Sequence, residues 1–152
     1  MVKIRGSERF FLIGLLQNLG ELLVAFQAPN LAIKCCNYDK KTPPWKLQQQ
    51  VLGFNYANYS SELMQIWHLP SQLYIPVINL HNENKALENK EVAIIYTAVR
   101  AGMAMTHHNL YSVNQLVTPL VVKYLKLDDE DLQDAIKFAS MEAEGVLDVM
   151  TP

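Results

Sequence analysis

The chain has 152 residues, 50% of them hydrophobic, which is enough for one domain with a substantial core. Its formal net charge of −2 excludes the strongly basic surface that attracts nucleic acid, so we expect no nucleic-acid partner. The two cysteines, Cys35 and Cys36, are adjacent in sequence, and neighbouring cysteines rarely pair. We therefore predict two free thiols, as in a reducing cytoplasm, and not a disulfide framework.

A long apolar run, "FFLIGLLQNLGELLVAF", lies close to the N-terminus. Three polar side chains, Gln17, Asn18 and Glu21, interrupt it, so it lacks the roughly 18 apolar residues in a row that a membrane span needs. No small-residue cleavage site follows it, as a signal peptide would require. We interpret the run as a helix of the folded domain, and we expect a cytoplasmic protein that does not contact a membrane.

The apolar residues recur with helical spacing almost throughout the chain, and no strand alternation of useful length occurs. Polar loops are predicted at 39–44 and 81–90, a turn at 106–112, and a kink at Pro119. The chain is therefore predicted to be all-α, a single-domain bundle over residues 1–152 with about seven or eight helices. The predicted helices cover residues 7–28, 30–38, 43–53, 55–69, a segment from 70, 89–105, 113–125 and 128–149.

The first predicted helix is apolar on two opposite faces, which is the pattern of a buried central helix. One face is a stripe formed by Leu12, Leu15, Leu16, Leu19, Leu22, Leu23 and Phe26. Phe10, Ile13 and Val24 lie on the opposite face, Gln17 points away from the stripe, and Asn18 lies on its flank. Burying an amide without a partner costs about 1–3 kcal/mol, so these two side chains must face hydrogen-bonding neighbours, water or a pocket.

The last predicted helix is the clearest amphipathic segment of the chain, with Asp128 as its N-cap. Its apolar stripe consists of Leu132, Ala135, Ile136, Ala139, Ala143, Val146 and Leu147. The acidic and basic side chains lie mainly on the other side. Spacing of this kind is typical of a helix that covers a core.

Two segments, taken together, resemble a known family. "FFLIGLLQNLGELLVAF" resembles the helix that carries the His-Asp doublet of HD-superfamily metal phosphohydrolases, usually written GLLHDIG. "LGFNYANYSSELMQIWHLPSQLYIPVINLHNE" looks like the family segment downstream of it, and its "WHLP" element is most typical of one branch. That branch is the HD-related output domain, HDOD, of bacterial signalling proteins. The chain is therefore identified as a degenerate HDOD member that matches the C-terminal part of the domain.

The resemblance implies that most metal ligands of the HD enzymes are replaced here. The His-Asp doublet falls on Gln17 and Asn18, the next histidine on Tyr56, and a His-His pair on Leu80 and His81. Amides are poor substitutes for imidazole and carboxylate ligands, and without a metal no water is activated to attack a phosphate ester. We therefore expect no catalytic residue, no metal and no cofactor. Gln17, Asn18, Tyr56 and His81 are taken as degenerate HD-site positions that form a candidate ligand pocket.

The function that the resemblance implies is a non-catalytic module of bacterial signal transduction that acts by binding a partner or a ligand. The alternative is a metal-dependent phosphohydrolase acting on nucleotides or cyclic dinucleotides, and a third interpretation is a metal-free binder of a small ligand. The family helices that precede the doublet are expected to be absent, which would leave an apolar face uncovered. We therefore expect a homodimer or a complex with a partner signalling protein.

Overall fold

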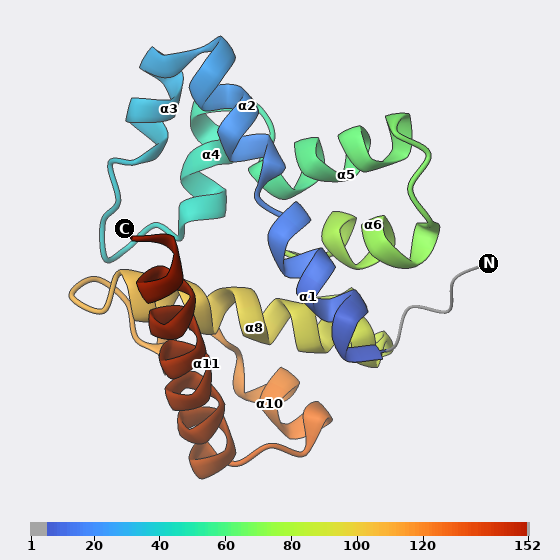
Figure 1. The fold of residues 1–152 in the computed structure, drawn as a ribbon, viewed down its shortest axis with the longest axis vertical. Coiled ribbons are helices and arrows are strands. Elements are labelled where there is room, and N and C mark those ends of the chain that lie inside the picture. Colours follow the sequence, from blue (N-terminus) through green and yellow to red (C-terminus); the bar gives the residue numbers. More distant parts are fainter. Residues whose placement is uncertain (1–5, 152) are drawn as a thin grey trace.

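The computed structural model describes residues 6–151, and within that range every regular element is a helix, as predicted. Residues 1–5 and Pro152 of the predicted domain lie outside the described residues. Figure 1 shows how the helices follow one another. They are α1 (Gly6–Leu16), α2 (Leu19–Gln27), α3 (Pro29–Cys35), α4 (Pro44–Leu52), α5 (Tyr56–Ile66), α6 (Ser71–Ile78), α7 (Glu83–Glu88), α8 (Lys90–Thr106), α9 (Val113–Leu116), α10 (Pro119–Leu125) and α11 (Asp129–Met150).

Local capping explains where several helices begin and end. At the start of α5, the Asn55 side chain accepts a hydrogen bond of 2.9 Å from the backbone N–H of Asn58. At the start of α11, Asp128 accepts one of 2.8 Å from the N–H of Asp131, so the predicted N-cap is confirmed. Gly53 follows α4 with a φ of 82°, a left-handed conformation that suits glycine at a helix end.

Residues 6–151 form more helices than the seven or eight predicted, and local sequence explains two of the differences. Part of the polar loop predicted at 81–90 is helix α7, because the Asn82 side chain caps it. Pro119 starts α10 and separates it from α9, where a kinked helix over 113–125 was predicted. In both places a polar or proline residue at a helix N-terminus decides the local structure.

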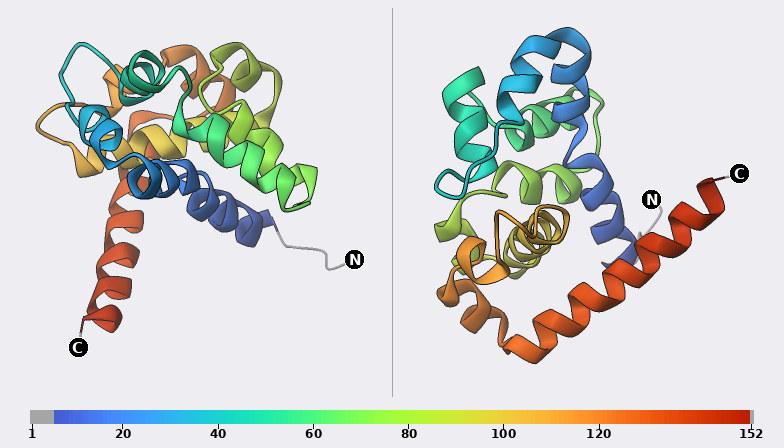
Figure 2. Two further views of the ribbon diagram at one scale, coloured as in Figure 1. Left: turned by 90° about the horizontal axis from the view of Figure 1, so that it is seen from above. Right: turned by 90° about the vertical axis from the view of Figure 1, so that its left-hand side faces the viewer.

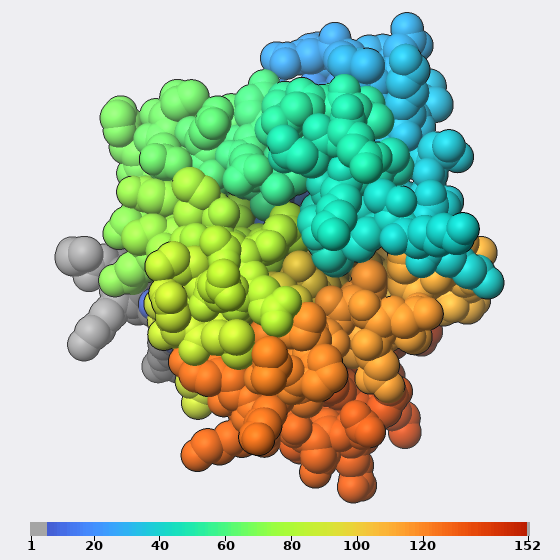
Figure 3. Space-filling model, turned by 180° about the vertical axis from the view of Figure 1, so that it is seen from behind, coloured from blue at the N-terminus to red at the C-terminus, as the bar shows by residue number. Residues whose placement is uncertain are grey.

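The centre of the molecule is α8, against which α1, α6, α7, α9, α10 and α11 pack. In contrast, α2 packs on α3 and α5. Figure 2 shows α11 leaving the body and projecting away from it, on the side where α1 and α2 lie. Seen from behind, residues of α4–α7 and of the segment after α8 form most of the surface (Figure 3). The side with α1, α2 and α11, called here the open side, is therefore opposite to the surface in Figure 3.

The segment Gly6–Gln27 is not the buried central helix that was predicted. Ile13 and Val24 are buried, but the leucine stripe is not: Leu15, Leu22 and Phe26 are exposed and its other members are half-buried. The segment reaches a mean hydropathy of 1.5, so it is long and apolar enough to cross a membrane, although a membrane span was not expected from the sequence. Core helices of soluble proteins and signal sequences have the same length and composition. The exposed side, called here the α1–α2 face, is formed by Phe11 (67% exposed), Leu15 (59%), Leu22 (66%) and Phe26 (86%).

The first part of α11 packs on the body, whereas the rest extends beyond it. Leu132 is buried, but Val146 and Leu147 of the same stripe are 58% and 61% exposed. An apolar groove of about 570 Å³, called here the α8–α11 groove, lies between the two helices. Its lining consists of Ile94, Thr97, Ala98, Ala101, Gly102, Met105, Leu125, Leu127, Leu132, Ala135, Ile136, Ala139 and Ala143.

Candidate functional site

The amide doublet lies at a break between two helices and not within one helix. The helix predicted over 7–28 ends at Leu16 and resumes at Leu19, with Gln17 and Asn18 in the turn between α1 and α2. The N–H of Gln17 still donates to the Ile13 carbonyl at 2.9 Å, so the break begins just after it. The prediction of a continuous helix was therefore wrong at this point.

Helix α5 holds the break in place. Ser60, which is fully buried, donates from Oγ to the Gln17 carbonyl at 2.7 Å and accepts from the Gly20 N–H at 2.8 Å. Gly20 packs so closely on α5 that a Cβ there would lie 2.4 Å from the Tyr56 carbonyl oxygen. These two hydrogen bonds satisfy backbone groups that helix ends leave unpaired. The doublet therefore occupies a fixed joint between α1 and α2.

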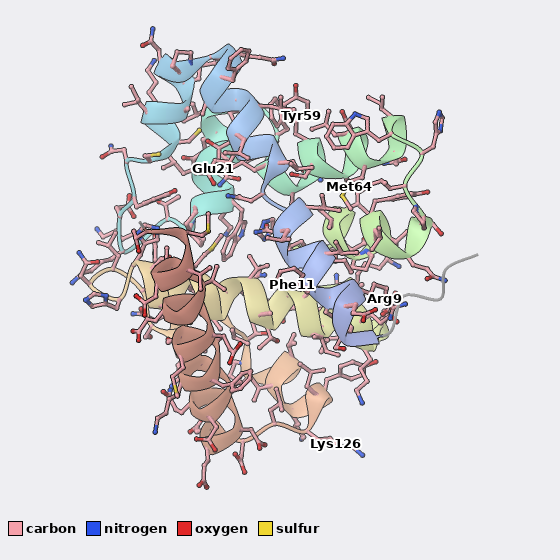
Figure 4. The ribbon with its side chains drawn as sticks, viewed as in Figure 1. Arg9, Phe11, Glu21, Tyr59, Met64 and Lys126 are labelled. Carbon is pink, nitrogen blue, oxygen red and sulfur yellow. The ribbon has the colours of Figure 1, made fainter. Side chains whose placement is uncertain are left out.

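Three of the four degenerate HD-site positions line one cavity, called here the joint cavity. It has a volume of about 490 Å³, and Gln17, Asn18 and Tyr56 line it, whereas His81 is not among its lining residues. Figure 4 labels Glu21, another lining residue, on α2. The other lining residues are Phe10, Gly14, Tyr38, Pro44, Gln48, Ile94, Ile95, Ala98, Val99, Gly102, Met103, Thr106 and His107.

Polar groups gather on the side of the joint cavity next to α2. The Asn18 Nδ2 donates to Glu21 Oε2, and the buried Gln48 accepts from the Tyr56 N–H at 2.9 Å. The Tyr56 hydroxyl is buried and has no hydrogen-bond partner within residues 6–151. Burial raises the pKa of Tyr56 well above its usual range, and Cys35 and the carboxylate of Glu21 raise it further. The phenol is therefore neutral over the physiological range.

Tyr38 and His107 line a further side of the joint cavity. Their ring centroids lie 4.8 Å apart with an angle of 58° between the planes. Burial raises the pKa of Tyr38 to about 12, with smaller contributions from Cys36 and Glu21. His107 belongs to the turn that the sequence predicted at 106–112. Its approach to Tyr38 joins the loop before α4 to the turn after α8, and no local pattern indicates a contact of that range.

His81 belongs to a second cluster. Its ring stacks on Trp45, with centroids 4.7 Å apart and 13° between the planes, and its Nδ1 lies 3.5 Å from a terminal nitrogen of Arg100. Burial, followed by the charge of Arg100, lowers the pKa of His81 to about 3. The imidazole is therefore neutral at physiological pH. The structure thus does not bring His81 together with the other three degenerate positions.

Arg100 is the centre of this second cluster, although it was not among the predicted site residues. It is 2% exposed, and its guanidinium donates to the carbonyls of Leu80 and Tyr96 at 3.0 and 3.2 Å. The same group lies over the rings of Tyr96 and Trp45, 3.4 and 4.3 Å from their centroids. Burial lowers the pKa of Arg100 to about 10, which still leaves it charged. An arginine inside the apolar "AIIYTAVRAGMAM" was the available signal.

Few side chains of the metal-binding type lie near one another. In the part of the chain that the structure describes, no group of three or more His, Cys, Asp or Glu residues is placed to hold a metal ion. The joint cavity has two such residues in its lining, Glu21 and His107. Its chemistry is that of hydrogen-bonding groups on one side and an apolar wall from α8 on the other.

The all-helical fold around this cavity is consistent with an HD-like domain. The HDOD domain family matches residues 1–83, more than half of the chain, so the chain belongs to the HDOD family. This family is a signalling-associated, HD-related group that is generally non-catalytic. The match includes all four degenerate positions, whereas α8–α11 lie beyond it. No curated protein and no solved structure matches the chain.

The predicted membership of this family is thus confirmed. The assignment of the chain to the C-terminal part of the family domain stays a prediction, as do the roles of the individual site residues.

Proposed function

We propose that this chain is a non-catalytic signalling module that acts by binding, in a bacterial cytoplasm, and does not hydrolyse phosphate esters. The observation that carries the proposal is the chemistry of the joint cavity. The positions that the resemblance gives to the metal-binding doublet and the next histidine carry two amides and a phenol, Gln17, Asn18 and Tyr56. Neutral amides and a protonated phenol hold a divalent cation poorly compared with imidazole and carboxylate.

The surroundings of His81 support the same proposal. This residue is the one imidazole at a family ligand position, and the guanidinium of Arg100 lies 3.5 Å from its Nδ1. A fixed positive charge at that distance repels a second cation from the same nitrogen. A metal-dependent phosphohydrolase needs several ligands that converge on a metal, which then activates a water. The metal-binding side chains in the lining of the joint cavity are Glu21 and His107.

The experiment is elemental analysis of protein purified without chelator, together with a hydrolysis assay on bis(p-nitrophenyl) phosphate with added manganese. We expect no stoichiometric iron, manganese or zinc, and no turnover above buffer. Asn18→Ala and Gln50→Ala are the matched pair, since Gln50 is an exposed amide on α4, outside the cavity. Stoichiometric metal, with turnover that Asn18→Ala abolishes and Gln50→Ala leaves intact, would contradict the proposal.

The partner that we propose is a second copy of the chain, bound through the open side of the molecule. Ten large apolar side chains of α1, α2 and α11 are more than half exposed: Phe11, Leu15, Leu22, Phe26, Phe138, Met141, Val146, Leu147, Val149 and Met150. At about 100 Å² each they expose on the order of 1,000 Å². A standard interface buries about 800 Å² on each partner, and patches of this size on soluble proteins mark association surfaces. The area is therefore sufficient for a two-fold homodimer.

A further inference from the structure

The outer part of α11, residues 141–150, exposes an apolar stripe. Every residue in this range is exposed to solvent. The stripe follows the groove residue Ala143 at helical spacing and consists of Val146, Leu147 and Met150. A helix in a protein is stabilised mainly by packing of its apolar side on another surface. The body supplies that surface at the start of α11, where Leu132 is buried, but the outer part extends beyond the body (Figure 2).

The α1–α2 face is a second apolar surface that is open to water. Its four large side chains recur at spacings of four, seven and four residues, which are helical spacings, and each is more than half exposed. Glu21 is the one charged residue within residues 10–27. The face is therefore apolar and almost uncharged, and it suits the apolar side of another helix.

The area of each surface is too small for a stable interface by itself. At about 100 Å² for each large side chain, the α1–α2 face exposes roughly 400 Å² and the stripe of the outer part of α11 roughly 300 Å². A standard interface buries about 800 Å² on each partner. A dimer that uses one of these surfaces reaches about half of that area, whereas a dimer that uses both approaches it.

Two-fold symmetry then determines how the two surfaces pair. In a two-fold dimer, a surface on the axis meets its own copy, whereas a surface away from the axis meets a different surface of the partner. The α1–α2 segment and α11 both pack on α8, and Figures 1 and 2 show them apart from one another on the open side. One axis does not pass through both. An axis between them pairs the α1–α2 face of each copy with α11 of the other.

The charges of α11 disfavour the pairing of this helix with its own copy. Its outer part carries three carboxylates, Glu142, Glu144 and Asp148, and residues 141–150 include no lysine or arginine. Contact between two such helices would bring both sets of carboxylates together, and like charges repel. The α1–α2 face, with Glu21 as its one charged neighbour in residues 10–27, presents much less negative charge.

We propose that the outer part of α11 of one copy packs on the α1–α2 face of a second copy, whose own α11 packs on the first copy in return. This inference rests on the proposed homodimer and specifies the contact that forms it. Val146 and Leu147 lie against the exposed phenylalanine and leucine side chains of the partner's α1–α2 face. Both apolar surfaces of each copy are then covered at once.

The first test is cross-linking between single-cysteine chains, all with Cys36→Ser, since Cys36 is the exposed cysteine. Ala25→Cys lies beside Phe26 on α2, and Ala143→Cys lies at the start of the α11 stripe; both alanines are exposed. A disulfide needs Cβ atoms about 4 Å apart, so it reports direct contact. Under mild oxidation at micromolar concentration, we expect the mixture of these two chains to cross-link about tenfold faster than either chain alone.

The control for this test is a mixture of Ala143→Cys with Gln50→Cys, an exposed position on α4, which should cross-link as slowly as Ala143→Cys alone. Faster cross-linking of Ala143→Cys with itself, or of Ala25→Cys with itself, in a dimeric chain would overturn the proposed contact and leave the homodimer intact. Equal rates in all mixtures would overturn it as well. A parent chain that is monomeric in light scattering would overturn both the contact and the homodimer, and binding of that monomer to phosphatidylcholine vesicles would assign the α1–α2 face to a membrane.

The second test is complementation between two variants that lack opposite halves of the contact. Leu22→Ser with Phe26→Ser alters the face, and Val146→Ser with Leu147→Ser alters the helix; all four side chains are exposed, so the fold should be retained, as circular dichroism checks. Each variant alone should dimerise at least tenfold more weakly than the parent. Their mixture keeps one intact contact, so native mass spectrometry should show heterodimers in excess of either homodimer. An α11 variant that dimerises like the parent, or a mixture without excess heterodimer, would contradict the reciprocal contact.

Discussion

The first and the last helical segments of this protein have the same length but differ in continuity and in packing. Gly6–Gln27 and Asp129–Met150 each span 22 residues, and each carries an apolar stripe at helical spacing. The first is broken at Gln17 and Asn18 and packs one side on α5, α6 and α8. The last is continuous, and most of it extends beyond the body (Figure 2). The difference lies in tertiary contacts, because Ser60 stabilises the break, whereas within residues 6–151 no side-chain hydrogen bond from another helix reaches the outer part of α11.

The largest effect on stability is expected when alanine replaces Gly20, the buried glycine of the first segment. Gly145, an exposed glycine of the last segment, is the control. Gly20→Ala places a Cβ 2.4 Å from a backbone oxygen of α5, so the two helices must move apart. We expect a loss of about 3 kcal/mol in the free energy of unfolding. Gly145→Ala on α11 meets nothing within 4 Å and should stabilise the protein by about 0.5–1 kcal/mol, since alanine favours a helix. Denaturant melts measure both, and equal effects would refute the contrast between the segments.

A somewhat smaller effect is expected when the hydroxyl that holds the break is removed. Ser60→Ala leaves the Gln17 carbonyl and the Gly20 N–H without their partner, at a cost of about 2 kcal/mol. Ser140→Ala, on α11, is the control and should change the stability by less than about 0.5 kcal/mol. Urea melts of the two variants decide this. A neutral Ser60→Ala would mean that the break persists without α5.

The N-caps of α2 and α11 should differ by about 1 kcal/mol. Asp128 caps α11 with its side chain, so Asp128→Ala should cost about 1 kcal/mol. Asn18 occupies the same position before α2 but makes no capping hydrogen bond, because its amide donates to Glu21 instead. Asn18→Ala should therefore cost only a few tenths of a kcal/mol. Thermal melts at one pH compare them, and a larger loss for Asn18→Ala would show that its side chain has a further structural partner.

The smallest effect on stability, and the clearest effect on assembly, is expected at the α1–α2 face. Leu22→Ser and Phe26→Ser replace side chains that are 66% and 86% exposed, so the free energy of unfolding of the monomer should change by less than about 0.5 kcal/mol. Light scattering at micromolar concentration should show a dimer for the parent and a monomer for the double variant. Ile66→Ser, 68% exposed on α5, is the control and should remain dimeric. A monomeric parent chain would contradict the proposed homodimer.

Much of the fold was predictable because it depends on neighbours in sequence. The proline that opens α4, the glycine that ends α4 and the cap at Asp128 act within one helical turn. Helix α7 was missed because its polar composition hides its start at Asn82. The all-α class followed from the apolar spacing alone.

The break and the buried arginine were not predictable, because residues far apart in sequence produce them. Ser60 reaches the Gln17 carbonyl from 43 residues away, and the local periodicity of "FFLIGLLQNLGELLVAF" gives no sign of it. Arg100 is held by a carbonyl 20 residues earlier in the chain and by aromatic rings from two helices. For the same reason, the resemblance predicted which positions are degenerate but not that His81 would lie apart from the other three.

Some residues of helix α8 line both the joint cavity and the α8–α11 groove. Ile94, Ala98 and Gly102 line the joint cavity on one side and the α8–α11 groove on the other. A molecule in the joint cavity that displaces these α8 residues therefore also changes the shape of the α8–α11 groove. In the other direction, a change in the position of α11 alters the space beside Gln17. Binding in the joint cavity and a change in the position of α11 therefore affect each other by the same coupling free energy, since such linkage is reciprocal. The joint cavity and helix α11 are thereby connected through one wall of α8.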